Sequence, residues 1–196
     1  MKKVAIALLI AVIVPCCIFA SRGMFDFTVG VAASSDYKIA DAAEIPEARE
    51  KFSIDKISFG ADVEMKLAFL ALDGKVMYQP ENKTIGGITS ANLALDLFFV
   101  RIKAGLGYEY QYNFDGGDLV FGNVNGYATE VKDFKNACFD LNAGVDFLIG
   151  SLTVGAYATL PSETSIAKGN WGDLFQCVKD GWKNAKLGMT VGIALF

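Results

Sequence analysis

Recurring carboxylates are the groups in this chain whose type and spacing could do chemistry. Asp62 and Glu64 lie two positions apart and Asp140 and Asp146 lie six apart, so each pair would share one face of a β-strand. Two carboxylates on one face could form an acid–base site. The favoured interpretation is structural, with these charges paired to Lys66, Arg101 and Lys103 inside the fold.

Histidine is absent from the whole chain. This absence removes the commonest general base and the commonest transition-metal ligand. We therefore expect a protein that is not an enzyme, with no catalytic residues, no metal site and no cofactor.

The elements that must position these carboxylates are strands, because apolar and polar residues alternate with a period of two. In 24–35, Phe25, Phe27 and Val29 share one face, while Asp26 and Thr28 share the other. The same alternation predicts eight strands, over 24–35, 55–67, 69–79, 91–99, 100–112, 138–148, 151–160 and 185–196. The last of these ends on an aromatic residue, Phe196.

The connections between these segments alternate in length. Very short turns join the second to the third, the fourth to the fifth and the sixth to the seventh segment. Long polar loops are expected over 36–54, 80–90, 113–137 and 161–184. Short turns at one end and long loops at the other are typical of a transmembrane barrel with an even number of strands.

The N-terminus has the order of parts found in a secretory signal peptide. Lys2 and Lys3 precede an uncharged apolar run over 4–14, and Ala20 offers a small residue for cleavage. We expect a signal peptide over 1–20 and one barrel domain over 21–196. The alternatives are an uncleaved anchor and a lipoprotein signal at Cys16 or Cys17.

Charge and hydropathy limit the partners and the way in which the chain could cross a membrane. A formal net charge of −4 argues against a nucleic-acid partner, which would require a basic face. No window after residue 20 is long and apolar enough for a transmembrane helix. A membrane-spanning mature chain must therefore form a closed barrel, which satisfies its backbone groups internally.

Alternation alone does not say which face of a barrel points outward, and a soluble lipocalin-type barrel would place the apolar face inside. Three features favour the membrane version: charges of both signs on the polar face, small residues on that face, and aromatic residues near the strand ends. The predicted lumen charge network comprises Asp62, Glu64, Lys66, Asp96, Arg101, Lys103, Glu109, Asp140, Asp146 and Lys186. The predicted aromatic belts are Phe25, Phe99 and Phe147 at the short-turn end, and Tyr78, Tyr108, Tyr110, Tyr112 and Phe139 at the long-loop end.

These features together resemble the small eight-stranded bacterial outer-membrane β-barrels, the class that contains the OmpA membrane domain, OmpX and OmpW. The resemblance is architectural and covers about residues 24–196. It implies an all-β, eight-stranded, antiparallel, transmembrane up-and-down β-barrel. It implies no functional residues, because no residue motif of a particular family is matched. Barrel enzymes of the outer membrane resemble one another in using histidine, which this chain lacks.

Two features of the long loops are candidate sites. Cys138 and Cys177 would both lie at the long-loop end, where an oxidising exterior allows a disulfide; two unpaired thiols are the alternative. A short amphipathic helix is predicted from apolar residues at helical spacing, namely Trp171, Leu174, Phe175, Val178 and Trp182. It would lie on the membrane surface or cap the barrel mouth.

The sequence predicts a bacterial outer-membrane protein whose lumen is filled by side chains and whose loops are exposed at the cell surface. The leading hypothesis is a structural or surface-interaction protein with an adhesion-type role. The alternative is a narrow, porin-like barrel that transports small, mostly hydrophobic molecules. The expected partners are outer-membrane lipid, the barrel-assembly machinery during biogenesis, and a host or extracellular ligand at the loops.

Overall fold

A computed structural model describes residues 23–38, 53–81, 83–113, 117–121, 134–172, 174, 178–179 and 182–195. The predicted signal peptide, Phe175, Cys177 and Phe196 lie outside the described residues. Among the described residues, no helix has the length and hydropathy needed to cross a membrane.

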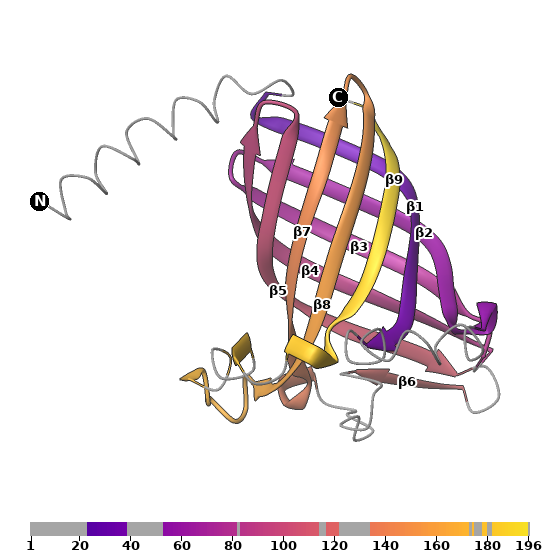
Figure 1. The fold of residues 1–196 in the computed structure, drawn as a ribbon. Helices are drawn as coiled ribbons and strands as arrows, with labels where there is room; N and C mark the ends of the chain where they lie inside the picture. Colours follow the sequence, from indigo (N-terminus) through magenta and orange to yellow (C-terminus); the bar gives the residue numbers. More distant parts are fainter. Residues whose placement is uncertain are drawn as a thin grey trace, which may run out of the picture.

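The described chain forms an antiparallel up-and-down barrel (Figure 1). Its eight wall strands are β1 (Phe25–Lys38), β2 (Ile57–Leu67), β3 (Leu70–Gln79), β4 (Thr84–Leu97), β5 (Val100–Asn113), β7 (Cys138–Ile149), β8 (Leu152–Ser165) and β9 (Lys186–Ala194). Each strand pairs with its neighbours, and the wall closes where β1 pairs with β9. This confirms the predicted fold class: all-β, eight-stranded, antiparallel and up-and-down.

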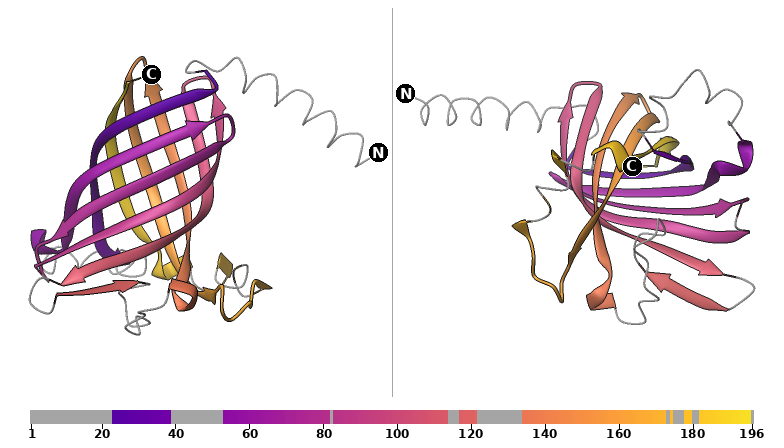
Figure 2. Two further views of the ribbon diagram at one scale, coloured as in Figure 1. Left: turned by 180° about the vertical axis from the view of Figure 1, so that it is seen from behind. Right: turned by 60° about the horizontal axis from the view of Figure 1, so that its bottom comes forward.

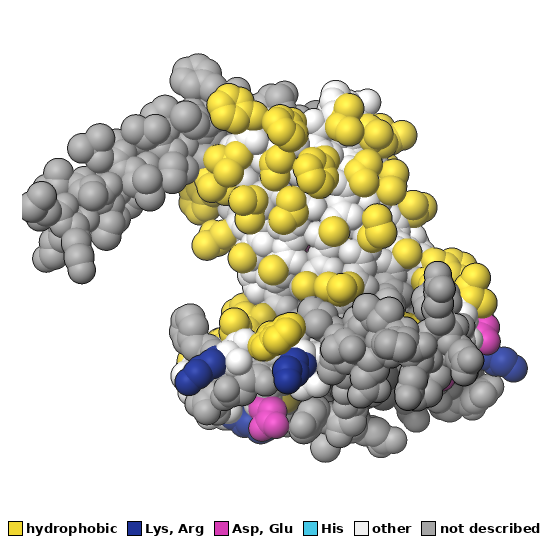
Figure 3. Space-filling model, viewed as in Figure 1, with side chains coloured by type: hydrophobic (Ala, Val, Ile, Leu, Met, Phe, Trp, Pro, Cys, Tyr) yellow, Lys and Arg dark blue, Asp and Glu magenta, His cyan; other side chains and the backbone are white. Residues whose placement is uncertain are grey.

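The barrel wall has an apolar outside and a polar inside. In β2, for example, Asp62, Glu64 and Lys66 are buried, while the alternating Val63 and Met65 are exposed. The same alternation runs along the other wall strands, and hydrophobic side chains cover the visible outer wall (Figure 3). A lipocalin-type barrel has the opposite arrangement, with its apolar face inside. An apolar outer face and a polar inner face are typical of a transmembrane barrel.

Three two-residue turns close the short-turn end of the barrel. They join β2 to β3, β4 to β5 and β7 to β8, as predicted. Tight hairpin turns that match strand twist require positive φ at their first residue. Ala68 and Phe98 adopt it with φ of 53° and 54°, and Gly150 adopts it with φ of 60° without steric cost.

The prediction of a long loop over 80–90 is wrong. Strand β4 begins at Thr84, so only residues 80–83 connect it to β3. Gly86 and Gly87 interrupt the apolar alternation there, which hides the strand in the sequence. In the sheet, both residues pair with β3 and β5, and the ring of Tyr110 packs against Gly87. Cross-strand contacts therefore replace the missing side chains.

The two largest of the other differences from the prediction lie at the long-loop end. Strand β8 continues to Ser165, through a bulge opposite Cys138 and Asp140 that accommodates Pro161. Strand β5 continues into a hairpin with the short strand β6 (Asp118–Phe121), which the sequence did not predict. This hairpin extends beyond the barrel wall at the long-loop end (Figure 2).

Candidate functional site

The lumen is the candidate functional site, and a fully buried arginine lies at its short-turn end. The Arg101 guanidinium reaches from β5 to three carboxylates on β1, β2 and β4. Its Nη2 lies 2.6 Å from Asp26 Oδ2, its Nη1 lies 2.5 Å from Glu64 Oε1, and its Nε lies 2.7 Å from Asp96 Oδ1. Since β1 and β2 do not border β5, these bonds cross the lumen.

Next to this arginine, the strand register places two carboxylates opposite each other, and one lysine forms ion pairs with both. Glu64 of β2 is directly opposite Asp73 of β3, and like charges in such pairs are destabilising. The Lys103 ammonium forms ion pairs with both carboxylates, and with Asp146 Oδ2 at 2.8 Å. One cation from β5 therefore neutralises acids on three other strands.

Two more lysines extend the network. Lys66 Nζ donates a 2.7 Å hydrogen bond to Asp96 Oδ2, and Lys75 Nζ lies 3.2 Å from Asp62 Oδ1 and also pairs with Asp73. We call the whole set the ionic plug: Asp26, Asp62, Glu64, Lys66, Asp73, Lys75, Asp96, Arg101, Lys103 and Asp146. Every member has an ion-pair partner of opposite charge. Burying such charges without partners would cost several kcal/mol per ion.

An apolar layer lies above the ionic plug, toward the long loops. Ala32, Met77 and Ile88 form a buried cluster, and the half-buried Tyr157 packs against it. The Tyr157 ring lies 4.7 Å from the Lys75 ammonium, within the range of a cation–π contact. A side chain on Gly188 would overlap this ring, so the glycine permits the ring to lie against the wall.

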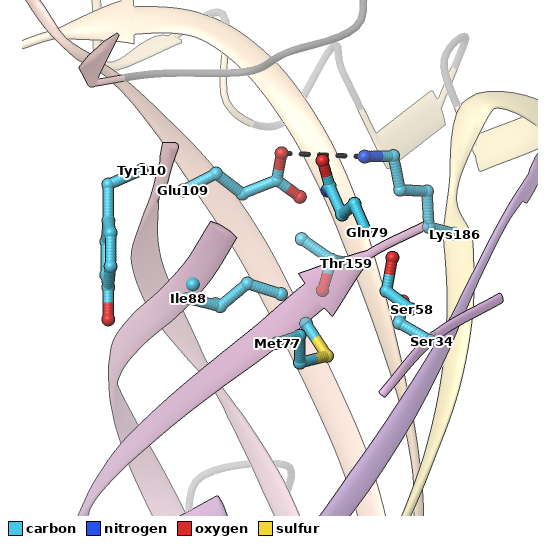
Figure 4. Close-up of a pocket in the computed structure, with 10 residues that line it drawn as sticks. Ser34, Ser58, Met77, Gln79, Ile88, Glu109, Tyr110, Thr159 and Lys186 are labelled. Carbon is cyan, nitrogen blue, oxygen red and sulfur yellow. Dashed lines mark ion pairs between the residues drawn. The ribbon is translucent and has the colours of Figure 1, made fainter. Parts of the chain in front are cut away.

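A small polar cavity lies above this layer, at the mouth of the barrel (Figure 4). Its volume is about 20 Å³, which is enough for one water molecule. Met77 and Ile88 form its apolar part. We call it the mouth cavity, and its polar lining consists of Ser34, Ser58, Gln79, Glu109, Thr159 and Lys186.

The charges at the mouth cavity are sparse. Glu109 Oε2 and Lys186 Nζ are 3.6 Å apart, too far for a direct hydrogen bond. Asp140 is fully buried beside them, and its Oδ2 accepts a 3.1 Å hydrogen bond from the Glu109 backbone N–H. Among the described residues, the buried Ser58 hydroxyl and Asp140 Oδ1 have no hydrogen-bond partner.

Asp140 also marks the place where two wall strands separate. Pairing between β5 and β7 ends at Gly107 and Asp140, after which β5 pairs with β6. Beyond Gly107, β5 no longer pairs with β7. The Asp140 carboxylate there accepts the hydrogen bond of the Glu109 backbone N–H, which a carbonyl of a neighbouring strand would otherwise accept. On the outside of this seam, the rings of Tyr108, Phe139 and Trp171 pack in a row at tilted angles, with successive centroids 4.6 and 5.4 Å apart.

All ten residues of the predicted charge network lie inside the barrel. Seven belong to the ionic plug, whereas Glu109, Asp140 and Lys186 lie near the mouth. The structure therefore divides what the sequence listed as one set. The predicted network did not include Asp26, Asp73 and Lys75, although the alternation places all three on the polar face of their strands. Tyr157 has the parity of the polar face, yet its ring packs on the apolar layer.

The loop candidates lie at the long-loop end. Cys138 carries a free thiol, and its predicted partner Cys177 lies outside the described residues. Residues 172, 174, 178 and 179 are helical, with Leu174 buried and Val178 exposed. Among the described residues, no cluster of three or more His, Cys, Asp and Glu side chains is placed to hold a metal ion.

Comparisons with known proteins add little to the description of this chain. No protein-family model matches the chain, and no curated protein matches it in sequence. The crystal structure of Neisserial surface protein A is similar at a TM-score of 0.36 and 13% identity, covering 88% of this chain and 96% of that one. The barrel assignment therefore rests on the strand pairing of this protein itself, which agrees with the resemblance to small outer-membrane barrels.

Proposed function

We propose that this chain is an integral barrel of the bacterial outer membrane that acts as a structural or surface-interaction protein, with its lumen closed by the ionic plug. The single observation that carries the proposal is Arg101, which has no exposed surface and bonds to carboxylates across the lumen. A barrel so filled offers the membrane a rigid anchor and leaves its long-loop end for contacts outside.

The outer wall supports membrane insertion. The wall positions that alternate with the buried residues carry no charged side chain from Ile57 to Leu67, from Leu70 to Tyr78 and from Leu187 to Ile193. Exposed aromatic residues occur near both ends, including Phe25, Phe99 and Phe147 at one end and Tyr78 and Tyr112 at the other. Such belts suit the two interfaces of a bilayer.

The alternative role, transport of small hydrophobic molecules along the barrel axis, finds no support in the lumen. A hydrophobic molecule would have to break buried ion pairs without replacing them. An enzymatic role is disfavoured as well, because the chain has no histidine and every carboxylate of the ionic plug is engaged by a cation.

Single-channel recording tests this function. The mature chain, refolded in detergent and inserted into a planar bilayer, should give no stable unit conductance. Slower gel migration after boiling, together with a β-type circular dichroism spectrum, would establish that the inserted protein is folded. A stable, large conductance from folded monomers would contradict the closed lumen and favour transport.

A further inference from the structure

The buried charges of the lumen do not balance. The ionic plug contains six carboxylates and four cations, and the mouth adds the carboxylates of Glu109 and Asp140 and the ammonium of Lys186. Carboxylates therefore outnumber cations inside the described part of the barrel. Burying an ionised group without compensation is strongly unfavourable, so a positive charge from the solution is favoured inside the lumen.

Asp140 is the carboxylate at which compensation is lacking. Each carboxylate of the ionic plug lies within ion-pair distance of a lysine or arginine, and Lys186 Nζ lies 3.6 Å from Glu109 Oε2. Among the described residues, no cation is paired with Asp140, whose side chain is fully buried. Its Oδ2 accepts the hydrogen bond of the Glu109 N–H, and its Oδ1 has no hydrogen-bond partner within the described chain.

The mouth cavity lies beside this carboxylate. In the wall, β7 lies between β5 and β8, so Asp140 lies between the strands of Glu109 and Thr159, two residues that line the cavity (Figure 4). Ser58 lines it from β2, which is four strands away from β7 in either direction round the barrel and is therefore opposite. The Ser58 side chain is buried, and its hydroxyl has no hydrogen-bond partner among the described residues. A ligand in the cavity would meet an unengaged oxygen on each side.

The groups around the cavity suit a cation that prefers oxygen ligands, because carboxylate and hydroxyl oxygens bind hard metal ions. The Thr159 hydroxyl donates its proton to Asn142 Oδ1 at 3.2 Å, so its oxygen can still bind a cation. Lys186 offsets one of the two carboxylates at the mouth, and the one negative charge that remains matches a monovalent ion. The cavity volume of about 20 Å³ admits one water-sized particle, and Na⁺ or K⁺ without its hydration shell is no larger.

We propose that the mouth cavity binds one monovalent metal cation, Na⁺ or K⁺, between Asp140 and Ser58. Glu109 and Thr159 supply further oxygen ligands. The ion compensates the charge of Asp140, which no described side chain neutralises. This inference goes beyond the proposed function, because it concerns the folded barrel in any surroundings.

The salt dependence of stability tests the site. The mature protein is folded in a non-ionic detergent, and thermal unfolding is followed in NaCl, KCl or N-methylglucamine chloride at one ionic strength, so that charge screening is equal. N-methylglucamine is too large for the cavity, whereas a ligand of the folded state raises the unfolding midpoint. The midpoint should be about 1–3 °C higher in NaCl or KCl. Equal midpoints in the three salts would overturn the site, and a rise with CaCl₂ alone would overturn the monovalent assignment.

Three variants locate the effect. Asp140→Asn removes the charge and keeps an oxygen for the Glu109 N–H, so the difference between the salts should vanish. Ser58→Ala removes a neutral ligand and should raise severalfold the cation concentration that gives half of the effect; it decides the matter if Asp140→Asn does not fold. Asp55→Asn is the control, because it removes an exposed carboxylate outside the cavity and should keep the full effect. An undiminished effect in Asp140→Asn or in Ser58→Ala would overturn the proposed ligands.

A crystal soaked in thallium(I) nitrate gives the position of the ion, since Tl⁺ replaces alkali-metal cations and scatters anomalously. An anomalous peak is expected inside the mouth cavity, at coordination distance from Asp140 Oδ1 and Ser58 Oγ. A map without a peak there would overturn the site. A peak of equal height in Asp140→Asn crystals would mean an adventitious ion only and would overturn it as well. Either failure leaves the proposed function standing, because single-channel recording tests the closed lumen separately.

Discussion

The ionic plug and the mouth cavity both lie on the inward face of β1 to β5, and β8 and β9 add Thr159 and Lys186 to the mouth, yet the electrostatics of the two regions differ. In the plug, Arg101 and Lys103 each contact three carboxylates. At the mouth, Glu109 and Lys186 are 3.6 Å apart beside a cavity that can hold a water molecule. The difference shows that a polar face alone does not close a barrel; closure requires cations long enough to reach acids on non-neighbouring strands.

Removing the central cation of the plug should have the largest effect. Arg101→Ala leaves Asp26, Glu64 and Asp96 without their shared partner, and breaking a buried ion pair costs about 3–5 kcal/mol. Urea unfolding in detergent, followed by the gel shift on boiling, measures the loss. Arg101→Lys is the matched control and should lose less, because it keeps the charge without the guanidinium fork. A loss below about 1 kcal/mol would contradict the central role of Arg101.

The apolar layer that separates the two regions should be the next most sensitive feature. Gly188→Ala places a methyl group against the Tyr157 ring, and overpacking of this kind costs about 1–3 kcal/mol. Gly74→Ala is the control, since a Cβ there meets its nearest heavy atom at 4.0 Å. The double variant Gly188→Ala with Tyr157→Leu should recover part of the loss. Equal effects of the two single variants would show that the ring does not require this glycine.

The ion pair at the mouth should contribute less than those of the plug. Lys186→Gln is expected to cost less than the loss of a hydrogen-bonded plug pair, because Lys186 Nζ and Glu109 Oε2 are 3.6 Å apart, too far for a direct hydrogen bond. Lys66→Gln is the matched plug variant, because Lys66 donates a 2.7 Å hydrogen bond to Asp96, and it should cost about 3 kcal/mol. Both are measured by urea unfolding at low and high salt. Equal losses would mean that the two regions do not differ in their electrostatics.

The smallest expected effect concerns the mouth hydroxyls. Ser58→Ala removes a buried hydroxyl that has no hydrogen-bond partner among the described residues, so stability should change by less than about 0.5 kcal/mol. Thr159→Val removes a hydroxyl that donates to Asn142 Oδ1 at 3.2 Å, and it should cost about 1 kcal/mol. Differential scanning calorimetry in detergent compares the two. A large loss for Ser58→Ala would point to a tightly held water in the cavity.

Strand positions and their faces could be read from the chain because alternation is a local property. Asp62, Glu64 and Lys66 could be placed on one face from their parity alone, and the structure has them buried together. The prediction was wrong over 84–90, where Gly86 and Gly87 carry no side chain to alternate. The hairpin of β5 with β6 was missed because only four residues form β6.

The sequence by itself determined that this chain forms strands with one apolar and one charged face, because side-chain direction in a strand follows from residue number. Only the tertiary structure decided which charges meet. Arg101 reaches Asp26 across 75 positions of sequence because closure of the wall brings β1 to the far side of the lumen from β5. The separation of β5 from β7 has the same origin, since Asp140 lies 31 positions along the chain from the Glu109 backbone N–H whose hydrogen bond it accepts.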